Sequence, residues 1–395
     1  GIAYVSAYAG QQVVLLDRKL EDAQKGKGYS STLLEKRISR GRMTENTAKA
    51  ILDRIHPTTD YADLEGCDLV IEAVFEDRGI KADVTAQTEA VIPETSIFAS
   101  NTSTLPITGL AEASKRPDQF IGIHFFSPVD KMPLVEVIVG EETGDVAIAQ
   151  ALDYIQQIRK TPIVVNDSRG FYTSRVFGTY SKEGIMMLAE GVSPALIENV
   201  AKHAGMPVGP LAVTDEVSIE LSYHVLKMTK AGLGDAYVAT AADEVVTKFI
   251  EELDRKGKKT GKGFYDYPEG GKKHLWPGLA EHYPLADTQP DPVEVRKRLL
   301  YVQAIDSVRC MEEGVVTHPA DADIGSIFGW GFPPYTGGTV SYIETIGLAD
   351  FVKEADRLAE AYGERFEVPD GLREMAAKGE TFYGRVDAAE QRSAA

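Results

Sequence analysis

The chain has 395 residues, 43% hydrophobic and 26% charged, which is typical of a folded globular protein. Its net charge of −18 argues against nucleic acid as a partner, and no apolar run approaches the ~18 residues of a membrane span. Only two cysteines, Cys67 and Cys310, are present, which indicates neither a disulfide framework nor a metal site. We therefore expect no metal and a reducing, cytoplasmic compartment.

The first segments of the chain predict an α/β domain. A helix over residues 2–9 ends at Gly10, and a short apolar strand over residues 12–17 closes on Asp17. An acid at the end of the second strand of a βαβ unit binds the ribose hydroxyls of NAD and repels the 2′-phosphate of NADP. Many strands end in an aspartate at a turn, so this signal is weak by itself.

Strands and helices then alternate. The predicted strands cover residues 68–74, 96–101, 120–124, 134–139 and 162–165, and the predicted helices cover residues 78–91, 105–114 and 146–159. In open α/β sheets ligands bind beyond the carboxyl ends of strands. Several polar residues fall at or just past such ends, and packing explains this clustering poorly: Asp17, Glu76, Asn101, Ser103 and His124.

A histidine and a glutamate in neighbouring apolar strands form the candidate catalytic pair. His124 ends one strand, and Glu136 lies inside the next. A carboxylate in an apolar strand is costly to bury unless it is paired. A glutamate that orients a histidine holds a general base in one tautomer near neutral pH. A core histidine beside a half-exposed edge-strand glutamate remains the alternative interpretation of these two residues.

Helical periodicity replaces the strand patterns from Arg169 onward. Helices are predicted over residues 175–188 and 293–311, and the Gly-, Lys- and Pro-rich residues 254–290 predict a turn and linker. The remaining histidines have no acid at ligand spacing, and we assign them no chemistry: His56, His203, His224, His274, His282 and His318.

Two pairs of segments suggest a weak internal repeat in the helical part. Residues 188–192 parallel residues 311–315, and residues 205–210 parallel residues 331–337. The second copy has no NAD-binding unit before it, so we expect it to be structural and to close the first copy over the active site. We expect the aromatic residues of this copy to pack within the repeat rather than bind a ligand: Trp330, Phe332 and Tyr335.

Six segments resemble those of the L-3-hydroxyacyl-CoA dehydrogenase family, most closely the dehydrogenase half of multifunctional fatty-acid β-oxidation enzymes. They are residues 70–76, 100–103, 124–128, 134–138, 167–171 and 259–267. The resemblance implies an α/β plus all-α fold. A Rossmann-like NAD-binding domain would cover residues 1–167, with its first strand absent from this chain. Two repeated helical domains would cover residues 168–288 and 289–395.

The resemblance also implies a reaction, the oxidation of L-3-hydroxyacyl-CoA to 3-ketoacyl-CoA with NAD as cofactor. His124 would be the base, Glu136 its orienting partner and Ser103 a hydrogen-bond donor to the reacting oxygen. Asparagine is usual in the family where this chain has Ser174 and Ser127, and the shorter serines keep a hydrogen-bonding group. The implied cofactor-binding residues are Gly1, as the third glycine of the dinucleotide loop, with Asp17, Ala73, Glu76, Lys81, Asn101, Ser103 and Ser127.

A basic cluster on the first long helix is the candidate site for the polyanionic CoA, since the chain as a whole is acidic. It consists of Lys36, Arg37, Arg40 and Arg42. We expect a second cluster, Arg255, Lys256, Lys258, Lys259 and Lys262, to be a solvated face or loop. The resemblance further implies an upstream enoyl-CoA hydratase domain and a thiolase-type β-subunit as partner. Without its first strand, the sheet should show a gap with unpaired strand edges.

Two other functions remain open at this point. The first is a non-catalytic NAD-fold scaffold subunit, suggested by Ser174 and by the missing glycine loop. The second is a 6-phosphogluconate-dehydrogenase-like oxidoreductase acting on a sugar acid. The basic cluster on the long helix and the segment from His124 to Phe126 favour a CoA substrate over the sugar acid.

Overall fold

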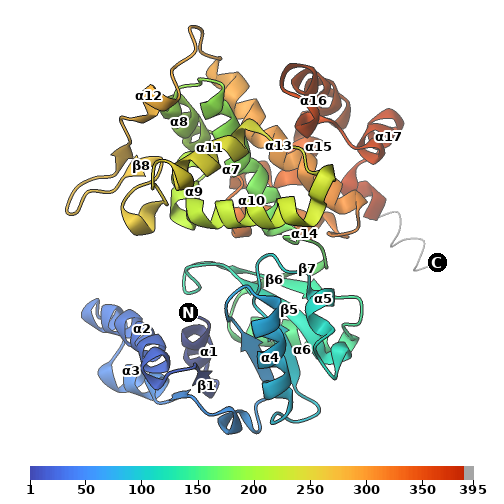
Figure 1. Ribbon diagram of the computed structural model, residues 1–395. Helices are drawn as coiled ribbons and strands as arrows, with labels where there is room; N and C mark the ends of the chain where they lie inside the picture. The colour runs from blue at the N-terminus through green and yellow to red at the C-terminus, as the bar shows by residue number, and fades with distance from the viewer. Residues whose placement is uncertain (387–395) are drawn as a thin grey trace. The chain divides into compact units, whose positions relative to one another are not determined.

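The computed structural model describes residues 1–386, which divide into two compact units. Of these residues, the NAD-binding unit comprises 1–174 and 313–329, and the helical unit comprises 175–312 and 330–386. Figure 1 colours the first unit mostly blue to teal and the second mostly green to red. Within the described residues, no helix is long and apolar enough to cross a membrane.

The NAD-binding unit contains two sheets. In the smaller one, β1 (Val13–Leu16) pairs in parallel with β2 (Ile55–Thr58). The larger one has five strands in the order β3-β4-β5-β6-β7. These strands are β3 (Leu69–Glu72), β4 (Ile97–Ser100), β5 (Phe120–Phe125), β6 (Leu134–Val139) and β7 (Thr161–Asn166). Only the β5–β6 pairing is antiparallel, so the carboxyl ends of β3, β4 and β5 meet at one edge.

The separation of the two sheets is the gap expected of a doubly wound sheet without its first strand. Among the described strands, β1 pairs only with β2, and β3 pairs only with β4. Each sheet therefore has an unpaired edge there. The predicted α/β class holds, and β2 is the strand that the apolar pattern missed, because His56 and Pro57 interrupt its short run.

Helices cover both faces of the larger sheet. The helices α1 (Ile2–Ala9) and α6 (Asp145–Gln157) pack into one apolar cluster with β4, β5 and β6. The Ser6 and Tyr154 hydroxyls link α1 to α6 at 2.8 Å. The short α5 (Ile107–Ala111) packs on the opposite face. There a Cβ on Gly122 would lie 2.9 Å from Ile107, so only glycine fits. The other helices of this part are α2 (Leu20–Ser39), α3 (Glu45–Leu52) and α4 (Arg78–Glu89).

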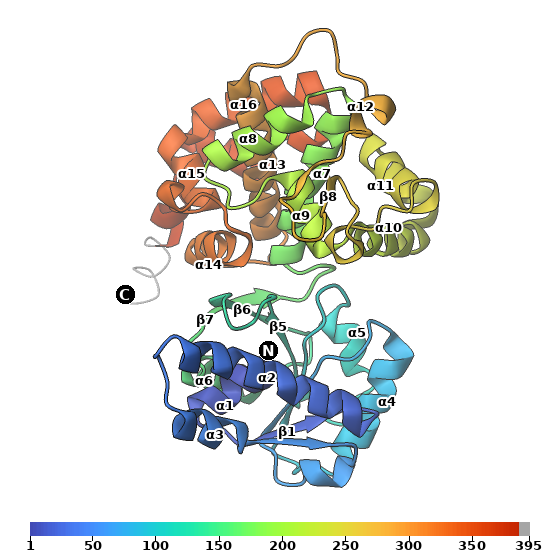
Figure 2. The same cartoon turned by 90° about the vertical axis from the view of Figure 1, so that its left-hand side faces the viewer.

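The helical unit is built around α13 (Pro292–Glu312), which Figure 2 shows in the middle of its neighbours. Most of α13 is buried, including Arg298 and Gln303, as expected of a helix surrounded by others. The other longer helices of this part are α7 (Thr173–Ala189), α8 (Pro194–His203), α9 (Pro210–Val217), α10 (Ile219–Leu233), α11 (Ala241–Glu251), α15 (Thr339–Ile346), α16 (Leu348–Tyr362) and α17 (Asp370–Lys378). The predicted linker also carries structure, namely β8 (Tyr265–Asp266), β9 (His274–Leu275) and α12 (Leu279–His282).

The two copies of the predicted repeat contact each other reciprocally. A Cβ on Gly205 would lie 3.0 Å from Pro333, and a Cβ on Gly331 would lie 2.5 Å from Pro207. Both glycines have positive φ angles, 101° and 80°, which other residues rarely adopt. The matching Gly-x-Pro motifs are therefore the points where one copy meets the other.

The aromatic residues of the second copy behave differently from one another. Trp330 and Phe332 are buried, and the Trp330 indole donates to Gln303 Oε1 at 2.8 Å, so their predicted packing role holds. Tyr335 is 73% exposed, but its ring edge lies beside Gly205 of the first copy, 3.1 Å from where a Cβ on that glycine would be, so it lies at the rim of the contact between the copies. The segment ahead of these residues, α14 (Pro319–Gly325), folds with the NAD-binding unit by packing on β7.

Candidate active site

His124 and Glu136 face each other across β5 and β6. The antiparallel register places them directly opposite, and His124 Nδ1 lies 2.9 Å from Glu136 Oε2. Glu136 is fully buried and His124 is 6% exposed, so the half-exposed edge-strand alternative for Glu136 is wrong. The carboxylate holds the imidazole in one orientation, as a positioned general base requires.

The remaining donors to Glu136 come from the start of α7. The backbone N–H groups of Tyr172 and Thr173 both donate to Oε1 at 3.0 Å, and the Thr173 hydroxyl donates to Oε2 at 2.6 Å. The chain reaches this position through Gly170 and Phe171, whose φ angles of 75° and 51° are left-handed. We name this arrangement around Glu136 the carboxylate cradle.

Thr173 is the residue around Glu136 that the sequence analysis missed. Its hydroxyl precedes a predicted helix, where such side chains usually cap their own helix. Here it donates to a carboxylate on a strand instead. Thr173 stands beside the equally polar Ser174 and Arg175, so its polar character did not distinguish it, and nothing local showed which partner the hydroxyl takes.

The cradle assigns different roles to the two ring nitrogens of His124. A carboxylate only accepts, so Nδ1 carries the proton in the neutral ring and Nε2 is the acceptor. Within the described residues, Nε2 has no hydrogen-bond partner. The rings of Phe126 and Phe171 lie 4.6 Å and 6.1 Å from the imidazole. The site can therefore take up one proton at Nε2 beside an apolar wall.

Asn101 and Ser103 lie just beyond the end of β4, as predicted. Asn101 Oδ1 accepts from the backbone N–H of Phe125, next to His124, which ties the ends of β4 and β5 together. Ser103 donates its backbone N–H to Glu76 at 3.0 Å. In the described residues its hydroxyl has no partner, so it is available to a bound molecule.

Glu76 and Lys81, both predicted to line the cofactor site, are engaged within the protein. Glu76 also accepts from the Thr102 hydroxyl, at 2.8 Å. Lys81 is 3% exposed, with its ammonium 2.9 Å from Glu72 and 3.4 Å from Glu76. Lys81 thus lies between the two carboxylates, and its place in the lining of the cofactor site stays a prediction. Ala73 is exposed after the end of β3.

The remaining predicted cofactor residues fit a dinucleotide. Asp17 is exposed at the carboxyl end of β1, with one oxygen accepting from the Arg18 backbone at 2.7 Å. A Cβ on Gly1 would lie 2.9 Å from Val129, so α1 starts where only glycine allows the close approach. Ser127 is exposed beyond β5. These residues suit the ribose and the helix start of a nicotinamide dinucleotide site.

The predicted substrate residues differ in accessibility. Ser174 is half-buried, one residue past Thr173 in α7. Lys36 and Arg40 are exposed at the end of α2. Arg37 instead donates to the Tyr8 hydroxyl at 3.0 Å and lies over that ring, so part of its role is to fasten α2 to α1.

The second basic cluster is not a wholly solvated loop. Its loop is held to Asp215 by hydrogen bonds, and we name this contact the clip. Arg255 is buried, donates to Gly263 O at 2.7 Å and lies 4.1 Å from the Trp276 ring centre. The same loop presents the backbone N–H groups of Phe264 and Tyr265 to Asp215 at 2.8 and 2.9 Å. The expectation of a solvated loop is therefore wrong for Arg255.

The other histidines form no metal site among the described residues, where no cluster of three or more ligand-type side chains is placed to hold an ion. Two of them do have an acid nearby, which the sequence spacing did not show. His56 lies 3.6 Å from Asp63, and His274 lies 3.7 Å from Asp266, all at the surface.

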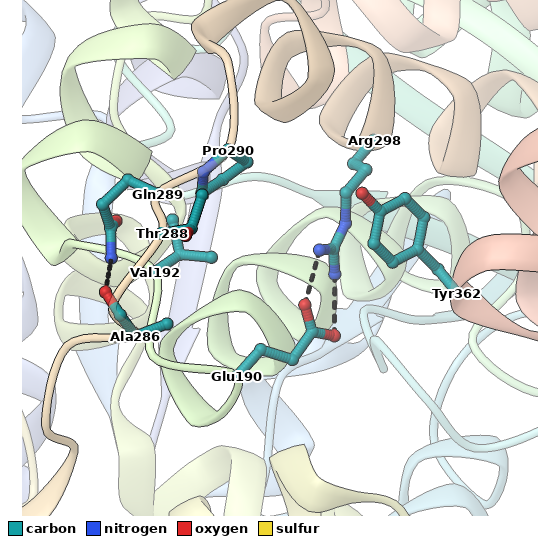
Figure 3. A pocket seen from close by; sticks show the side chains of 8 residues that line it. All are labelled: Glu190, Val192, Ala286, Thr288, Gln289, Pro290, Arg298 and Tyr362. Atoms are coloured by element: carbon teal, nitrogen blue, oxygen red, sulfur yellow. Dashed lines mark hydrogen bonds and ion pairs between the residues drawn. The ribbon is translucent and has the colours of Figure 1, made fainter.

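A pocket in the helical unit has two charged residues in its lining, Glu190 and Arg298, and they pair with each other (Figure 3). The Arg298 guanidinium donates to both oxygens of Glu190, at 2.5 and 2.9 Å, beside the ring of Tyr362. Arg298 also donates to the fully buried Glu183 at 2.6 Å. These ion pairs join α7 to α13, and we interpret the pocket as structural.

Comparisons with known protein families match the chain in two parts. Residues 1–168 match the 3-hydroxyacyl-CoA dehydrogenase NAD binding domain, and residues 170–267 match the C-terminal domain of the same family. The first match identifies NAD as the cofactor of this chain.

Individual relatives extend this similarity. The fatty acid oxidation complex subunit alpha of Pseudomonas aeruginosa (strain LESB58) is 39% identical over 97% of this chain, which spans 54% of that relative. The chain thus spans about half the length of the curated relatives it matches.

Two solved structures are also similar. The structure of 3-hydroxybutyryl-CoA dehydrogenase from Escherichia coli K12 shares the fold, with a TM-score of 0.80, 24% identity and 95% coverage of both chains. The (S)-3-hydroxybutyryl-CoA dehydrogenase of Ralstonia eutropha is 34% identical, with a TM-score of 0.63, over 68% of this chain and 94% of that chain. With its NAD-binding and C-terminal segments both matched, this chain belongs to the 3-hydroxyacyl-CoA dehydrogenase family.

Proposed function

We propose that this chain oxidises L-3-hydroxyacyl-CoA thioesters to 3-ketoacyl-CoA in fatty-acid β-oxidation. The observation that carries the proposal is the buried His124–Glu136 pair, held at 2.9 Å across β5 and β6. Its open ring nitrogen lies in the same unit as Asn101 and Ser103, which follow the carboxyl end of β4. A proton acceptor beside a cofactor-binding sheet edge is what alcohol oxidation requires.

Each residue of the pair has one step in this reaction. His124 Nε2 takes the proton of the substrate hydroxyl, while Nδ1–H keeps donating its hydrogen bond to Glu136 Oε2. The imidazolium that forms therefore lies against a carboxylate. The Ser103 hydroxyl donates to the reacting oxygen. NAD, when bound, supplies the acceptor for the electron pair of the C–H bond.

Asp17 supports the choice of NAD over NADP. Its exposed carboxylate at the end of β1 would accept hydrogen bonds from free ribose hydroxyls and repel a 2′-phosphate. Asp17→Ala should therefore narrow the preference for NAD, measured as the ratio of kcat/KM for the two cofactors. Equal use of NADP by the unaltered protein would contradict this role.

The assembly of the relatives suggests further properties of the natural protein. Several are named subunit alpha of a fatty acid oxidation complex. We extend this to a chain that acts beside an enoyl-CoA hydratase activity and with a thiolase-type β-subunit. Copurification of the natural protein with a thiolase activity, lost at high salt or on dilution, would support the extension.

The central test is NADH formation from L-3-hydroxyacyl-CoA substrates of several chain lengths by the full-length protein. His124→Gln should lower kcat by about 10²–10⁴-fold and leave NAD affinity unchanged. His203→Gln is the matched control, because His203 is an exposed residue at the end of α8. A protein that binds NAD but oxidises none of these substrates would favour the scaffold alternative.

A further inference from the structure

We propose that Thr173 is a positioning residue for the His124–Glu136 pair, and that its hydroxyl limits the negative charge that Glu136 Oε2 presents to the imidazole. The inference rests on the proposed function for its kinetic consequences. The contact itself belongs to the NAD-binding unit and stands without that function.

The hydroxyl shares one oxygen with the imidazole. Thr173 Oγ1 lies 2.6 Å from Glu136 Oε2, the oxygen that also accepts from His124 Nδ1 at 2.9 Å. The other oxygen, Oε1, is occupied by two backbone N–H groups. Thr173 is 1% exposed, so bulk water does not compete for this contact. A short hydrogen bond to an ionised, dry carboxylate is among the stronger interactions available to a neutral side chain.

This contact should change the electrostatics of the imidazole in a definite direction. Each donor to a carboxylate disperses its negative charge. Removing the hydroxyl leaves more charge on Oε2, which then attracts the imidazolium more strongly. The expected consequence of losing the hydroxyl is a more strongly held imidazolium, and hence less of the neutral base at a given pH.

Residues 313–329, which fold with the NAD-binding unit, pack behind this hydroxyl. A Cβ on Gly329 would lie 3.3 Å from Thr173 Cγ2 and 3.1 Å from Leu134, so the backbone there lies close to the threonine. The Tyr172 hydroxyl donates to Ala322 O in α14 at 2.8 Å. The segment that the repeat contributes to the NAD-binding unit thus holds the Tyr172–Thr173 turn in place.

Other charged groups on the surrounding elements are engaged elsewhere. On β3, Glu72 accepts from Lys81, and after β7 the Asp167 carboxylate accepts from the N–H groups of Ile107 and Thr108 in α5. On α6, Asp145 and Asp153 are exposed and the Tyr154 hydroxyl bonds Ser6. Glu136 is therefore the titratable group that contacts His124, and a change in its hydrogen bonding should dominate the titration.

The kinetic test compares Thr173→Val, which keeps the shape and removes the hydroxyl, with Thr173→Ser, which keeps the hydroxyl. In Thr173→Val the acid limb of the kcat/KM profile should move to higher pH by about half a unit to one unit. At a pH on that limb, kcat of Thr173→Val should be several-fold lower than that of the wild-type protein, with KM for NAD unchanged. Thr173→Ser should restore the wild-type midpoint.

A second readout needs no substrate. NMR titration of the His124 ring, assigned by its loss in His124→Gln, should show the same upward shift in Thr173→Val and its reversal in Thr173→Ser. A folded Thr173→Val protein with an unshifted His124 titration would overturn the proposal. Absence of dehydrogenase activity in the wild-type protein would count against the proposed function alone, because the titration still measures the effect of Thr173.

Discussion

The two units each bury a carboxylate in nearly the same way. In the NAD-binding unit, Glu136 accepts from two successive backbone N–H groups and the Thr173 hydroxyl. In the helical unit, Asp215 accepts from the successive N–H groups of Phe264 and Tyr265, and from the Tyr267 hydroxyl at 3.1 Å. What differs is the group beside them, because Glu136 alone has a histidine within hydrogen-bond distance.

This difference separates the candidate catalytic site at Glu136 from the structural clip at Asp215. Burial raises the pKa of Asp215 to about 6, against the opposing effect of its hydrogen bonds, and no imidazole uses the charge. The carboxylate instead fastens the loop at Gly263 to α9. A buried, backbone-bound carboxylate therefore indicates rigidity in both units, and only the ring across from Glu136 makes it chemically useful.

The largest expected effect comes from neutralising the catalytic carboxylate. Glu136→Gln should lower kcat by about 10²–10⁴-fold, because the amide no longer stabilises the imidazolium. Asp215→Asn is the matched control, and it should leave kcat unchanged in protein that remains folded. Steady-state NADH formation measures both, and equal losses in the two variants would remove the distinction between site and clip.

The pH dependence of the unfolding free energy should show the raised pKa of Asp215. Its pKa is raised on folding, so the folded state binds the proton more tightly than the unfolded state, whose value is near 3.8. The resulting stability is fully present below about pH 4 and is lost as the pH rises through about 6, with a loss of about 3 kcal/mol. Asp215→Asn should flatten this dependence. Urea unfolding at pH values across this window tests it, and parallel curves for the two proteins would refute the assignment.

The close approach of Gly263 sharpens the description of the clip. A Cβ there would lie 2.0 Å from Asp215 Oδ1, so Gly263→Ala should cost about 1–3 kcal/mol of unfolding free energy. Gly178→Ala on α7 has open space and should be neutral or stabilising by up to about 1 kcal/mol. Chemical denaturation compares the two, and an undestabilised Gly263→Ala would mean that the loop can move away from Asp215.

The smallest expected effect comes from a change at Tyr172, whose hydroxyl lies behind the carboxylate cradle. Tyr172→Phe removes the hydroxyl that donates to Ala322 O but keeps the backbone N–H that donates to Glu136. It should cost about 0.5–1.5 kcal/mol of stability. It should also change kcat far less than Glu136→Gln does. A loss of kcat as large as that of Glu136→Gln would show that α14 takes a direct part in setting the pair.

Apolar runs were enough to predict most strands and the pairing of His124 with Glu136. The five strands of the larger sheet are long enough, and apolar enough, to stand out, and β5 and β6 are neighbours in both sequence and space. Strand β2 escaped because His56 and Pro57 interrupt a four-residue element.

Partners that depend on tertiary contacts were beyond the sequence pattern. Thr173 reaches Glu136 only because Gly170 and Phe171 turn the chain through left-handed angles. Arg255 appeared to belong to a solvated basic loop, yet it is buried against Trp276. Lys81 was predicted to line the cofactor site, and the sequence did not show that it also lies between Glu72 and Glu76. In each case the neighbouring sequence is compatible with an exposed or a buried side chain, and the partner in the folded structure determines which of the two occurs.

The reciprocal contacts of Gly205 with Pro333 and of Gly331 with Pro207 determine how the pairing of the two copies responds to dilution. A self-complementary surface of this kind usually joins two separate subunits, and dilution then pulls them apart. Here both surfaces belong to one polypeptide, so each is always present to the other at a fixed effective concentration. The contact between the two copies should therefore survive at protein concentrations where an equivalent pair of free subunits would dissociate.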